Sequence, residues 1–147
     1  MIHTIQIENT VSCSDVKPEL IKKLTAWILQ TSDHQNPWSI TFVFTDDSYI
    51  INLNVRFFNT SNPTDVISFN LSDSEDSPEG EIYISVDTAA RHAEEYHVSL
   101  ENELFRLVAH GVYHLIGYDD DTPEQKYRMT ELEDKALFFI DKEQENY

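Results

Sequence analysis

The sequence predicts a single α+β domain over residues 1–147, in which several helices pack against a small mixed β-sheet. Its length is close to the commonest size of one domain. Segments with the patterns of strands and of helices are interspersed, but they do not alternate as strictly as in a purely parallel sheet. No internal repeat or linker divides the chain, because the acidic stretch 72–81 is too short to separate two cores.

The N-terminal third of the chain predicts a strand, a helix and a second strand. Residues 3–8 alternate polar and apolar side chains, as a half-buried strand does. Apolar residues recur at helical spacing over about 16–29, and Pro18 lies where the first turn of a helix tolerates proline. Residues 39–45 are rich in β-branched and aromatic side chains, so we expect them to form a central strand.

The middle of the chain predicts a helix and a third strand. The helix is capped by Asp46 or Asp47 and runs to about Phe58. Pro63 ends it, since proline lacks the amide hydrogen that a continuing helix needs. Residues 65–70 then have the composition of a strand.

Beyond the acidic stretch, the chain predicts one strand and three helices. Residues 81–86 favour a strand and 87–96 a helix. Ser99 is a suitable cap for the next helix, which ends near Gly117. Residues 122–125 combine a capping box with proline at the first helical position, and they open a terminal helix.

Composition excludes several classes of protein. The 27 acidic and 10 basic residues give a formal charge of −17, which repels polyanions and by itself disfavours nucleic acid as a partner. The longest apolar run, Ala136 to Ile140, is far shorter than the roughly 20 residues of a membrane helix. The single cysteine, Cys13, cannot pair within the chain, and the first residues lack a secretory signal pattern. We therefore expect a cytoplasmic protein with no DNA or membrane partner.

The acidic residues are concentrated in two segments. Residues 72–81 carry five acids and no base, and Ser, Pro and Gly make up the rest, so we expect a solvated loop. Residues 119–147 carry ten acids and four bases. The segment between them contains two histidines four residues apart. This uneven distribution leaves room for a local cationic spot in spite of the total charge.

The most informative stretch begins with His110 and His114. Histidines four residues apart project from successive turns of one helix face, so their imidazoles can share a metal ion. Gly117 can adopt a left-handed conformation that ends the helix and turns the chain, which brings Asp120 toward the same ion. If the turn differs by one residue, Asp119 or Asp121 is the third ligand in place of Asp120. Two imidazoles and one carboxylate leave a position open for water, as in catalytic rather than structural zinc sites.

The spacing H-x-x-x-H-x-x-G-x-x-D is that of an extended zincin site whose third ligand is a carboxylate. Gly111 stands where the H-E-x-x-H metallopeptidases carry their general-base glutamate. A peptidase of that type would therefore lack its base. The pattern favours a metal-dependent hydrolase with another substrate.

Three blocks of the sequence agree with the motifs of one family. Residues 110–120 are similar to H-G-x-x-H-x-x-G-Y-D-H and depart from it only at the last position, where Asp120 replaces histidine. Residues 53–56 share Leu and Asn with L-N-x-x-[YF]-R but carry their arginine two positions earlier than that motif does. Residues 62–69 are similar to K-P-T-[DN]-V-L-S-F, and residues 80–84 to G-D-[IL]-x-I. In order and spacing these blocks resemble the YbeY proteins, which are bacterial metal-dependent endoribonucleases of ribosomal RNA maturation and ribosome quality control. The resemblance covers about residues 40 to 140, and the first forty residues match only in the order of their elements.

The resemblance implies a single-strand-specific endoribonuclease that matures the 3′ end of small-subunit ribosomal RNA, with the ribosome or ribosomal proteins as partners. It implies one zinc ion held by His110, His114 and Asp120, the last in place of the family's usual third histidine. A carboxylate there weakens the Lewis acidity of the ion and shifts the preference toward harder metals. It also implies that Arg56 is catalytic and clamps the phosphate, and that His114 can act as an acid or base when it is not bound to metal.

Two other functions stay open at this point. One is a metallopeptidase-like hydrolase, which Gly111 disfavours, and the other is a non-enzymatic ribosome-assembly factor in which Asp120 marks a weakened metal site. Three residues of the second block are expected to line the cleft: Thr64, Asp65 and Ser68. The remaining histidines have no partner at ligand spacing and are expected at the surface: His3, His34, His92 and His97.

Overall fold

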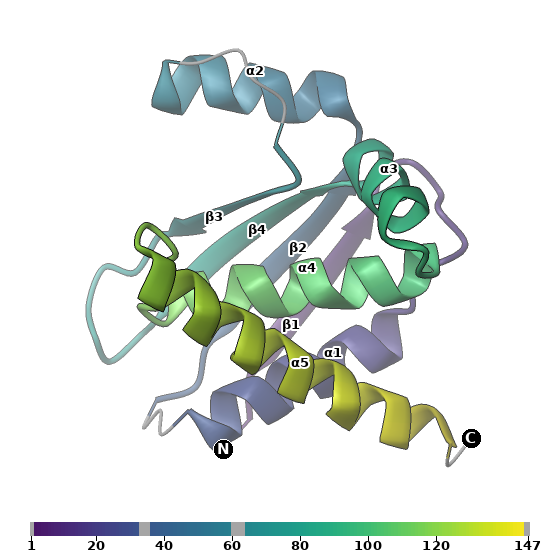
Figure 1. The fold of residues 1–147 in the computed structure, drawn as a ribbon. Helices are drawn as coiled ribbons and strands as arrows, with labels where there is room; N and C mark the ends of the chain where they lie inside the picture. Colours follow the sequence, from purple (N-terminus) through teal and green to yellow (C-terminus); the bar gives the residue numbers. More distant parts are fainter. Residues whose placement is uncertain (1, 33–35, 60–63, 146–147) are drawn as a thin grey trace.

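All the strands and helices that the sequence predicts are present. The computed structural model describes residues 2–32, 36–59 and 64–145 (Figure 1). The strands are β1 (Thr4–Asn9), β2 (Ser39–Thr45), β3 (Val66–Asn70) and β4 (Glu79–Ser85). The helices are α1 (Pro18–Thr31), α2 (Asp47–Phe58), α3 (Val86–Tyr96), α4 (Leu100–Leu115) and α5 (Pro123–Glu145). His34, Asn62 and Pro63 lie outside the described ranges, and with them the expected turn after α2.

The strands form one mixed sheet in the order β1-β2-β4-β3. β1, β2 and β4 run parallel, with Phe42 between Ile7 and Ile82 in the register. β3 pairs antiparallel with β4 and forms an edge of the sheet. The predicted α+β class with a small mixed sheet is confirmed.

The acidic loop is shorter than expected. We predicted that residues 72–81 form a loop, but β4 already begins at Glu79, which is paired with Ser39 of β2. The backbone oxygen of Glu79 also accepts a hydrogen bond from the amide of Leu71, at 2.8 Å. Pairing on both sides therefore outweighs the loop-like composition of this segment.

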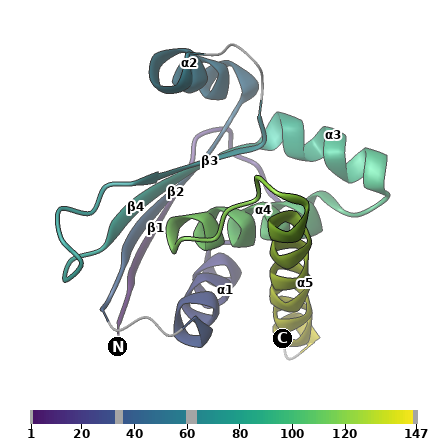
Figure 2. The ribbon, with the colours of Figure 1, turned by 60° about the vertical axis from the view of Figure 1, so that its left-hand side comes forward.

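Three helices cover one face of the sheet. Figures 1 and 2 show α4 against the strands, with α1 and α5 packed beyond it. The main core lies between these layers, where Phe42 and Ile82 of the sheet meet Leu104 and Val108 of α4, all of them almost fully buried. Burial of large apolar side chains on both layers is the main force that holds α4 in place. Among the described helices, none is both long and apolar enough to span a membrane.

Helix α2 lies on the opposite face of the sheet (Figure 2). Its buried Ile50 and Leu53 form a second, smaller core with Ile67 of β3. The cap is Asp46 rather than Asp47, because the Asp46 carboxylate accepts a hydrogen bond from the amide of Tyr49, at 2.9 Å. The sheet therefore separates α2 from α4.

Candidate metal centre

Helix α4 presents His110 and His114 side by side. The Ser99 hydroxyl caps the helix by accepting a hydrogen bond from the amide of Asn102, as predicted. Both imidazoles are only partly exposed, at 21% and 27% of their side-chain surface. Their Nε2 atoms lie 2.9 Å apart, so one edge of each ring points at a common position.

The turn after α4 brings Asp120 to the same position. Gly117 has a φ of +106°, and the amides of Gly117 and Tyr118 donate hydrogen bonds back to carbonyl oxygens of the last helical turn. The Asp120 Oδ2 atom lies 3.4 Å from His110 Nε2 and 3.5 Å from His114 Nε2. Among the described histidine, cysteine and acidic side chains, these three form a group whose ligand atoms all lie within 4.8 Å of one another. Asp119 and Asp121 do not belong to that group.

The three side chains fit a zinc ion. Two ligands of a tetrahedral zinc site with metal–nitrogen bonds of about 2.0–2.1 Å lie roughly 3.3–3.4 Å apart. The distances between Asp120 and the two imidazoles match that edge, and the distance between the imidazoles is only slightly shorter. The donor set of two nitrogens and one oxygen is also one that zinc accepts. These residues could therefore hold a catalytic ion with an open position.

Gly111 is required by the packing of α4 against the sheet. A Cβ atom at this position would lie 2.7 Å from Ile82 Cγ2 and 3.2 Å from the Ser68 hydroxyl. The Ser68 hydroxyl also donates a hydrogen bond to the Gly111 carbonyl oxygen, at 3.0 Å. Ser68 thus binds β3 to α4. A glutamate in place of Gly111 would point into the sheet, so the position that supplies the base in H-E-x-x-H peptidases cannot supply one here.

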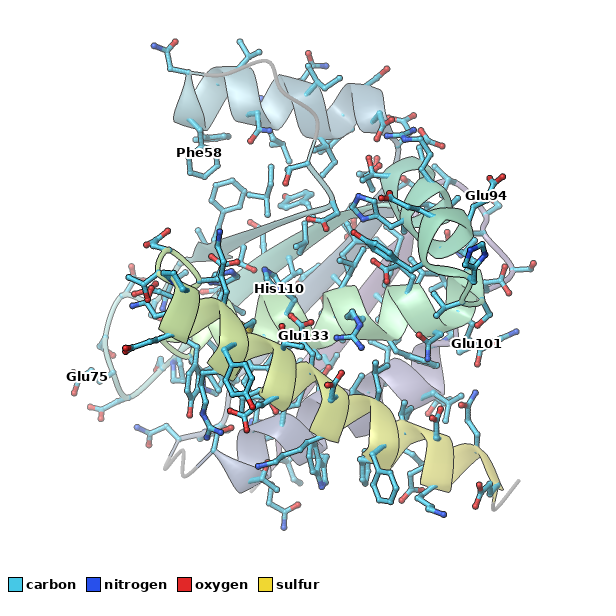
Figure 3. All side chains as sticks on the ribbon, in the orientation of Figure 1. Phe58, Glu75, Glu94, Glu101, His110 and Glu133 are labelled. Atoms are coloured by element: carbon cyan, nitrogen blue, oxygen red, sulfur yellow. The ribbon has the colours of Figure 1, made fainter. Side chains whose placement is uncertain are left out.

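A buried glutamate that sequence reasoning missed contacts His110. The Glu133 Oε2 atom of α5 lies 2.7 Å from His110 Nδ1, on the ring edge opposite the metal position (Figure 3). Burial lowers the pKa of His110, but the hydrogen bond and charge of Glu133, with Asp65 and Asp120 beyond it, outweigh burial and raise it. A signal was present in the sequence, because Glu133 interrupts the apolar face of the terminal helix next to Leu132.

A cavity of about 350 Å³ adjoins the triad, with His110 and Asp120 in its wall. Of the three residues expected to line the cleft, Asp65 does so, whereas Thr64 and Ser68 are not among the lining residues of this cavity. His92 also lines it, although we expected a surface residue, and its Nδ1 lies 3.6 Å from Asp65 Oδ2 and 3.7 Å from Glu103 Oε2. Burial raises the pKa of Glu103. The wall of the cavity thus combines acidic side chains with the cations Arg106 and Lys126.

Arg56 lies apart from the triad. It is exposed near the end of α2, on the other face of the sheet from α4, and its guanidinium lies 5.5 Å from the centroid of the Phe57 ring. It does not line the cavity beside the triad. Within the described part of the chain, the structure thus brings together the three predicted metal ligands but not the predicted phosphate clamp.

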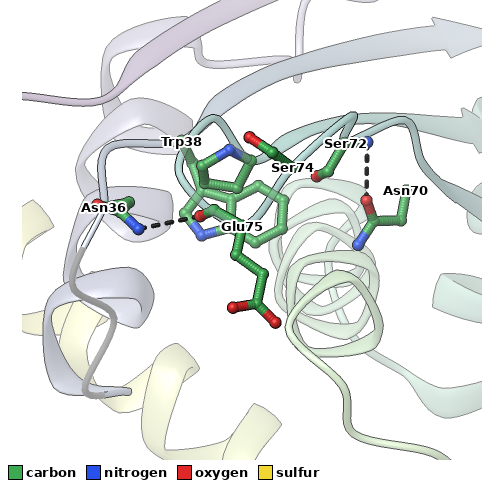
Figure 4. Close-up of a pocket in the computed structure, with 7 residues that line it drawn as sticks. Asn36, Trp38, Asn70, Ser72, Ser74 and Glu75 are labelled. Atoms are coloured by element: carbon green, nitrogen blue, oxygen red, sulfur yellow. Dashed lines mark hydrogen bonds between the residues drawn. The ribbon is translucent and has the colours of Figure 1, made fainter.

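A larger cavity, of about 560 Å³, lies beside the loop between β3 and β4 (Figure 4). Trp38 forms part of its wall, and two hydrogen bonds shape its rim: Asn36 Nδ2 donates to the Glu75 carbonyl oxygen, and the Ser72 amide donates to Asn70 Oδ1. Its lining includes none of the three candidate ligands. Two of the candidate ligands, His110 and Asp120, line the smaller cavity instead.

Comparisons with known proteins agree on one family. The family model described as Endoribonuclease YbeY matches residues 5–141. The chain is 40% identical to the endoribonuclease YbeY of Chloroherpeton thalassium, over 91% of this chain and 93% of that protein. It is 32% identical to the endoribonuclease YbeY of Acetivibrio thermocellus, over 89% and 91% respectively. The solution structure of TM1509 from Thermotoga maritima superposes with a TM-score of 0.68 at 26% identity, over 97% of this chain and 93% of that one. The chain therefore belongs to the endoribonuclease YbeY family.

Proposed function

We propose that this protein is a metal-dependent endoribonuclease that cleaves single-stranded RNA in the cytoplasm during ribosomal RNA maturation and ribosome quality control. Its substrate would be the 3′ end region of small-subunit ribosomal RNA. The observation that carries the proposal is the convergence of His110, His114 and Asp120 on one position at the wall of a cavity. Membership of a family whose relatives are named endoribonucleases supports the substrate class.

In this proposal His110, His114 and Asp120 hold one zinc ion. A zinc ion bound there supplies Lewis acidity toward a phosphoryl oxygen. His114 is a ligand first, and its Nε2 is free to accept or donate a proton only when it is not coordinated. Asp120 contributes a negative charge where the family usually has a neutral histidine, so a harder divalent ion is the natural competitor of zinc.

Arg56 is proposed to bind a phosphate of the RNA. An exposed guanidinium can donate two parallel hydrogen bonds to phosphate oxygens, and Arg56 has the exposure that this requires. Because β3 is an edge strand, an RNA strand that passes around that edge can reach both α2 and the triad on α4. Arg56 therefore acts on a phosphate of the bound strand from the far side of the sheet.

Recognition is proposed to depend on a protein partner. The total charge of −17 opposes the approach of free RNA. A ribosome or ribosomal protein that holds the chain next to its substrate would supply the missing affinity through a high effective concentration.

The test is cleavage of ribosomal RNA fragments by zinc-loaded protein. We expect the wild type to cut single-stranded but not duplex fragments, and His114→Ala and Arg56→Ala to lose that activity. Arg128→Ala is the matched control, because it removes an exposed arginine from α5 that pairs only loosely with Glu131, and it should cut normally.

Three outcomes would contradict the proposal. Equal cleavage by the wild type and all three variants would indicate a contaminating nuclease. Peptide hydrolysis that is lost on chelation would indicate a peptidase, although the packing of Gly111 leaves no room for the usual general-base glutamate. If the wild-type protein holds no stoichiometric metal and the variant Asp120→His both binds metal and cleaves RNA, the protein is an assembly factor with a weakened site.

A further inference from the structure

Glu133 is a carboxylate in an apolar position. It lies on the face of α5 that is turned toward the core, among Met129, Leu132 and Ala136, and only 7% of its surface is exposed. A buried carboxylate is costly unless it is both paired and hydrogen-bonded. The partners of Glu133 therefore explain why a charged group is retained there.

Both oxygens of Glu133 are occupied. Oε1 accepts a hydrogen bond from Arg106 Nη1 at 2.8 Å, and Oε2 lies 2.7 Å from His110 Nδ1. The other terminal nitrogen of Arg106 donates to Asp134 Oδ1 at 2.9 Å, which holds the guanidinium in place. As a carboxylate, Glu133 can only accept hydrogen bonds, so the hydrogen between Glu133 and His110 belongs to Nδ1.

The position of that hydrogen decides which atom of His110 can bind a metal. A neutral imidazole carries one hydrogen, and if Nδ1 holds it, the lone pair is on Nε2. His110 Nε2 is the atom that faces His114 Nε2 and Asp120. The contact on one edge of the ring thus prepares the opposite edge for coordination.

We infer that Glu133, held by Arg106, is a positioning residue that keeps His110 as the Nδ1–H tautomer and presents Nε2 to the metal. The inference rests on the proposed function, because it requires that His110 is a ligand. The three ligands lie on α4 and in the turn after it. The inference adds a residue of α5 to the metal site. Loss of such an outer partner typically lowers metal affinity about 10- to 100-fold.

The variant Glu133→Gln distinguishes positioning from mere space filling. A glutamine has one oxygen and one NH2 group, and Arg106 requires the oxygen because it can only donate. The NH2 group would then face His110 Nδ1 and place the imidazole hydrogen on Nε2, where the metal must bind. We expect Glu133→Gln to lower zinc affinity by about 10- to 100-fold although its shape is nearly unchanged.

A second substitution should reverse that effect. In Arg106→Met with Glu133→Gln, no guanidinium claims the amide oxygen, so the amide can turn and accept from His110 Nδ1. We expect this double variant to recover most of the affinity that Glu133→Gln loses. Glu131→Gln is the matched control, because Glu131 is an acid on the same helix with a side chain that is 42% exposed, and it should leave zinc affinity unchanged.

The experiment measures zinc affinity of the full chain by competition with a chromophoric chelator. In parallel, ¹⁵N NMR of the metal-free protein identifies which imidazole nitrogen of His110 carries the hydrogen, at a pH where the ring is neutral. We expect Nδ1 in the wild type, Nε2 in Glu133→Gln, and Nδ1 again in the double variant. Both readouts are independent of RNA cleavage.

The outcomes separate this inference from the proposed function. If the wild type binds no zinc, the proposed metal site is wrong. If the wild type binds zinc but Glu133→Gln has the same affinity and the same tautomer, the site stands and the role of Glu133 is overturned. If Glu133→Gln does not fold, the tautomer of the wild type still tests the inference, because an Nε2–H wild type contradicts it.

Discussion

Replacing Gly111 with alanine tests how closely α4 approaches the sheet. The added Cβ would lie 2.7 Å from Ile82 Cγ2 and 3.3 Å from Ile82 Cδ1. An ordinary contact between carbon atoms is about 3.5–4.0 Å, so the first of these distances is too short by roughly 0.8 Å. Ile82 is fully buried, and its Cγ2 atom is bonded to a β-branched Cβ that is stiff at χ1. The helix itself must therefore move away from β4.

The expected loss of stability is the difference of two effects. Overpacking a well-filled core costs about 1–3 kcal/mol. Alanine is favoured over glycine inside a helix by about 1 kcal/mol, which offsets part of that cost. The difference is about 0–2 kcal/mol, and because the short contact is with buried carbon atoms we expect Gly111→Ala to lower the free energy of unfolding by roughly 1–2 kcal/mol, in the upper half of that range. For a chain of this size, that corresponds to a decrease in Tm of about 3–8 °C.

The assay is thermal and denaturant unfolding of chelator-treated protein, so that metal binding does not shift the transition. Ile82→Ala alone should cost about 2–5 kcal/mol. The double variant Gly111→Ala with Ile82→Ala should lose less than the sum of the single losses, because the new methyl group fills part of the vacated space. Unchanged or increased stability of Gly111→Ala would refute the reasoning and mean that α4 lies farther from β4 than the structure places it.

Three further predictions concern the site. In a chelator competition, Asp120→Ala should lower zinc affinity by more than about 100-fold, because loss of a ligand costs more than the roughly 10- to 100-fold typical of losing an outer partner. Asp120→His should bind zinc at least as well as the wild type. Arg56→Ala should reduce the slope of log affinity for single-stranded RNA against log salt by about 0.7, and an unchanged slope would remove Arg56 from the phosphate contacts. The raised pKa of His110 stabilises the metal-free fold fully below the unfolded-state value of about 6.5, and this contribution is lost as pH rises through the folded-state pKa. Unfolding of the wild type and His110→Ala should therefore differ most in acid, and a difference that grows toward alkaline pH would contradict the assignment.

Local spacing was sufficient to predict the three candidate ligands. His110 and His114 are one helical turn apart, and the left-handed turn at Gly117 places Asp120 beside them, so all three positions follow from a short stretch of backbone. The same holds for the caps: Ser99 accepts from the amide of Asn102, as its position before an apolar run predicts. Contacts within one turn are decided by covalent geometry.

Contacts between distant elements could not be predicted in this way. His92, expected at the surface, lies in the cavity wall because α3 packs against α4, and Glu133 reaches His110 because α5 crosses the same helix. Arg56 was predicted to share the site, but its helix lies on the other face of the sheet. No spacing rule relates these residues, since they are brought together or apart by the packing of whole elements.

The sequence by itself determined the elements, the α+β class and the His110–His114–Asp120 triad, because each depends on side-chain periodicity or on a single turn. Only the tertiary structure decided the strand order with β3 at the edge, the close packing of Gly111 against the sheet and the contact between Glu133 and His110. These features depend on which apolar surfaces pack together. Packing of that kind is settled by the burial of the whole core and not by any segment alone.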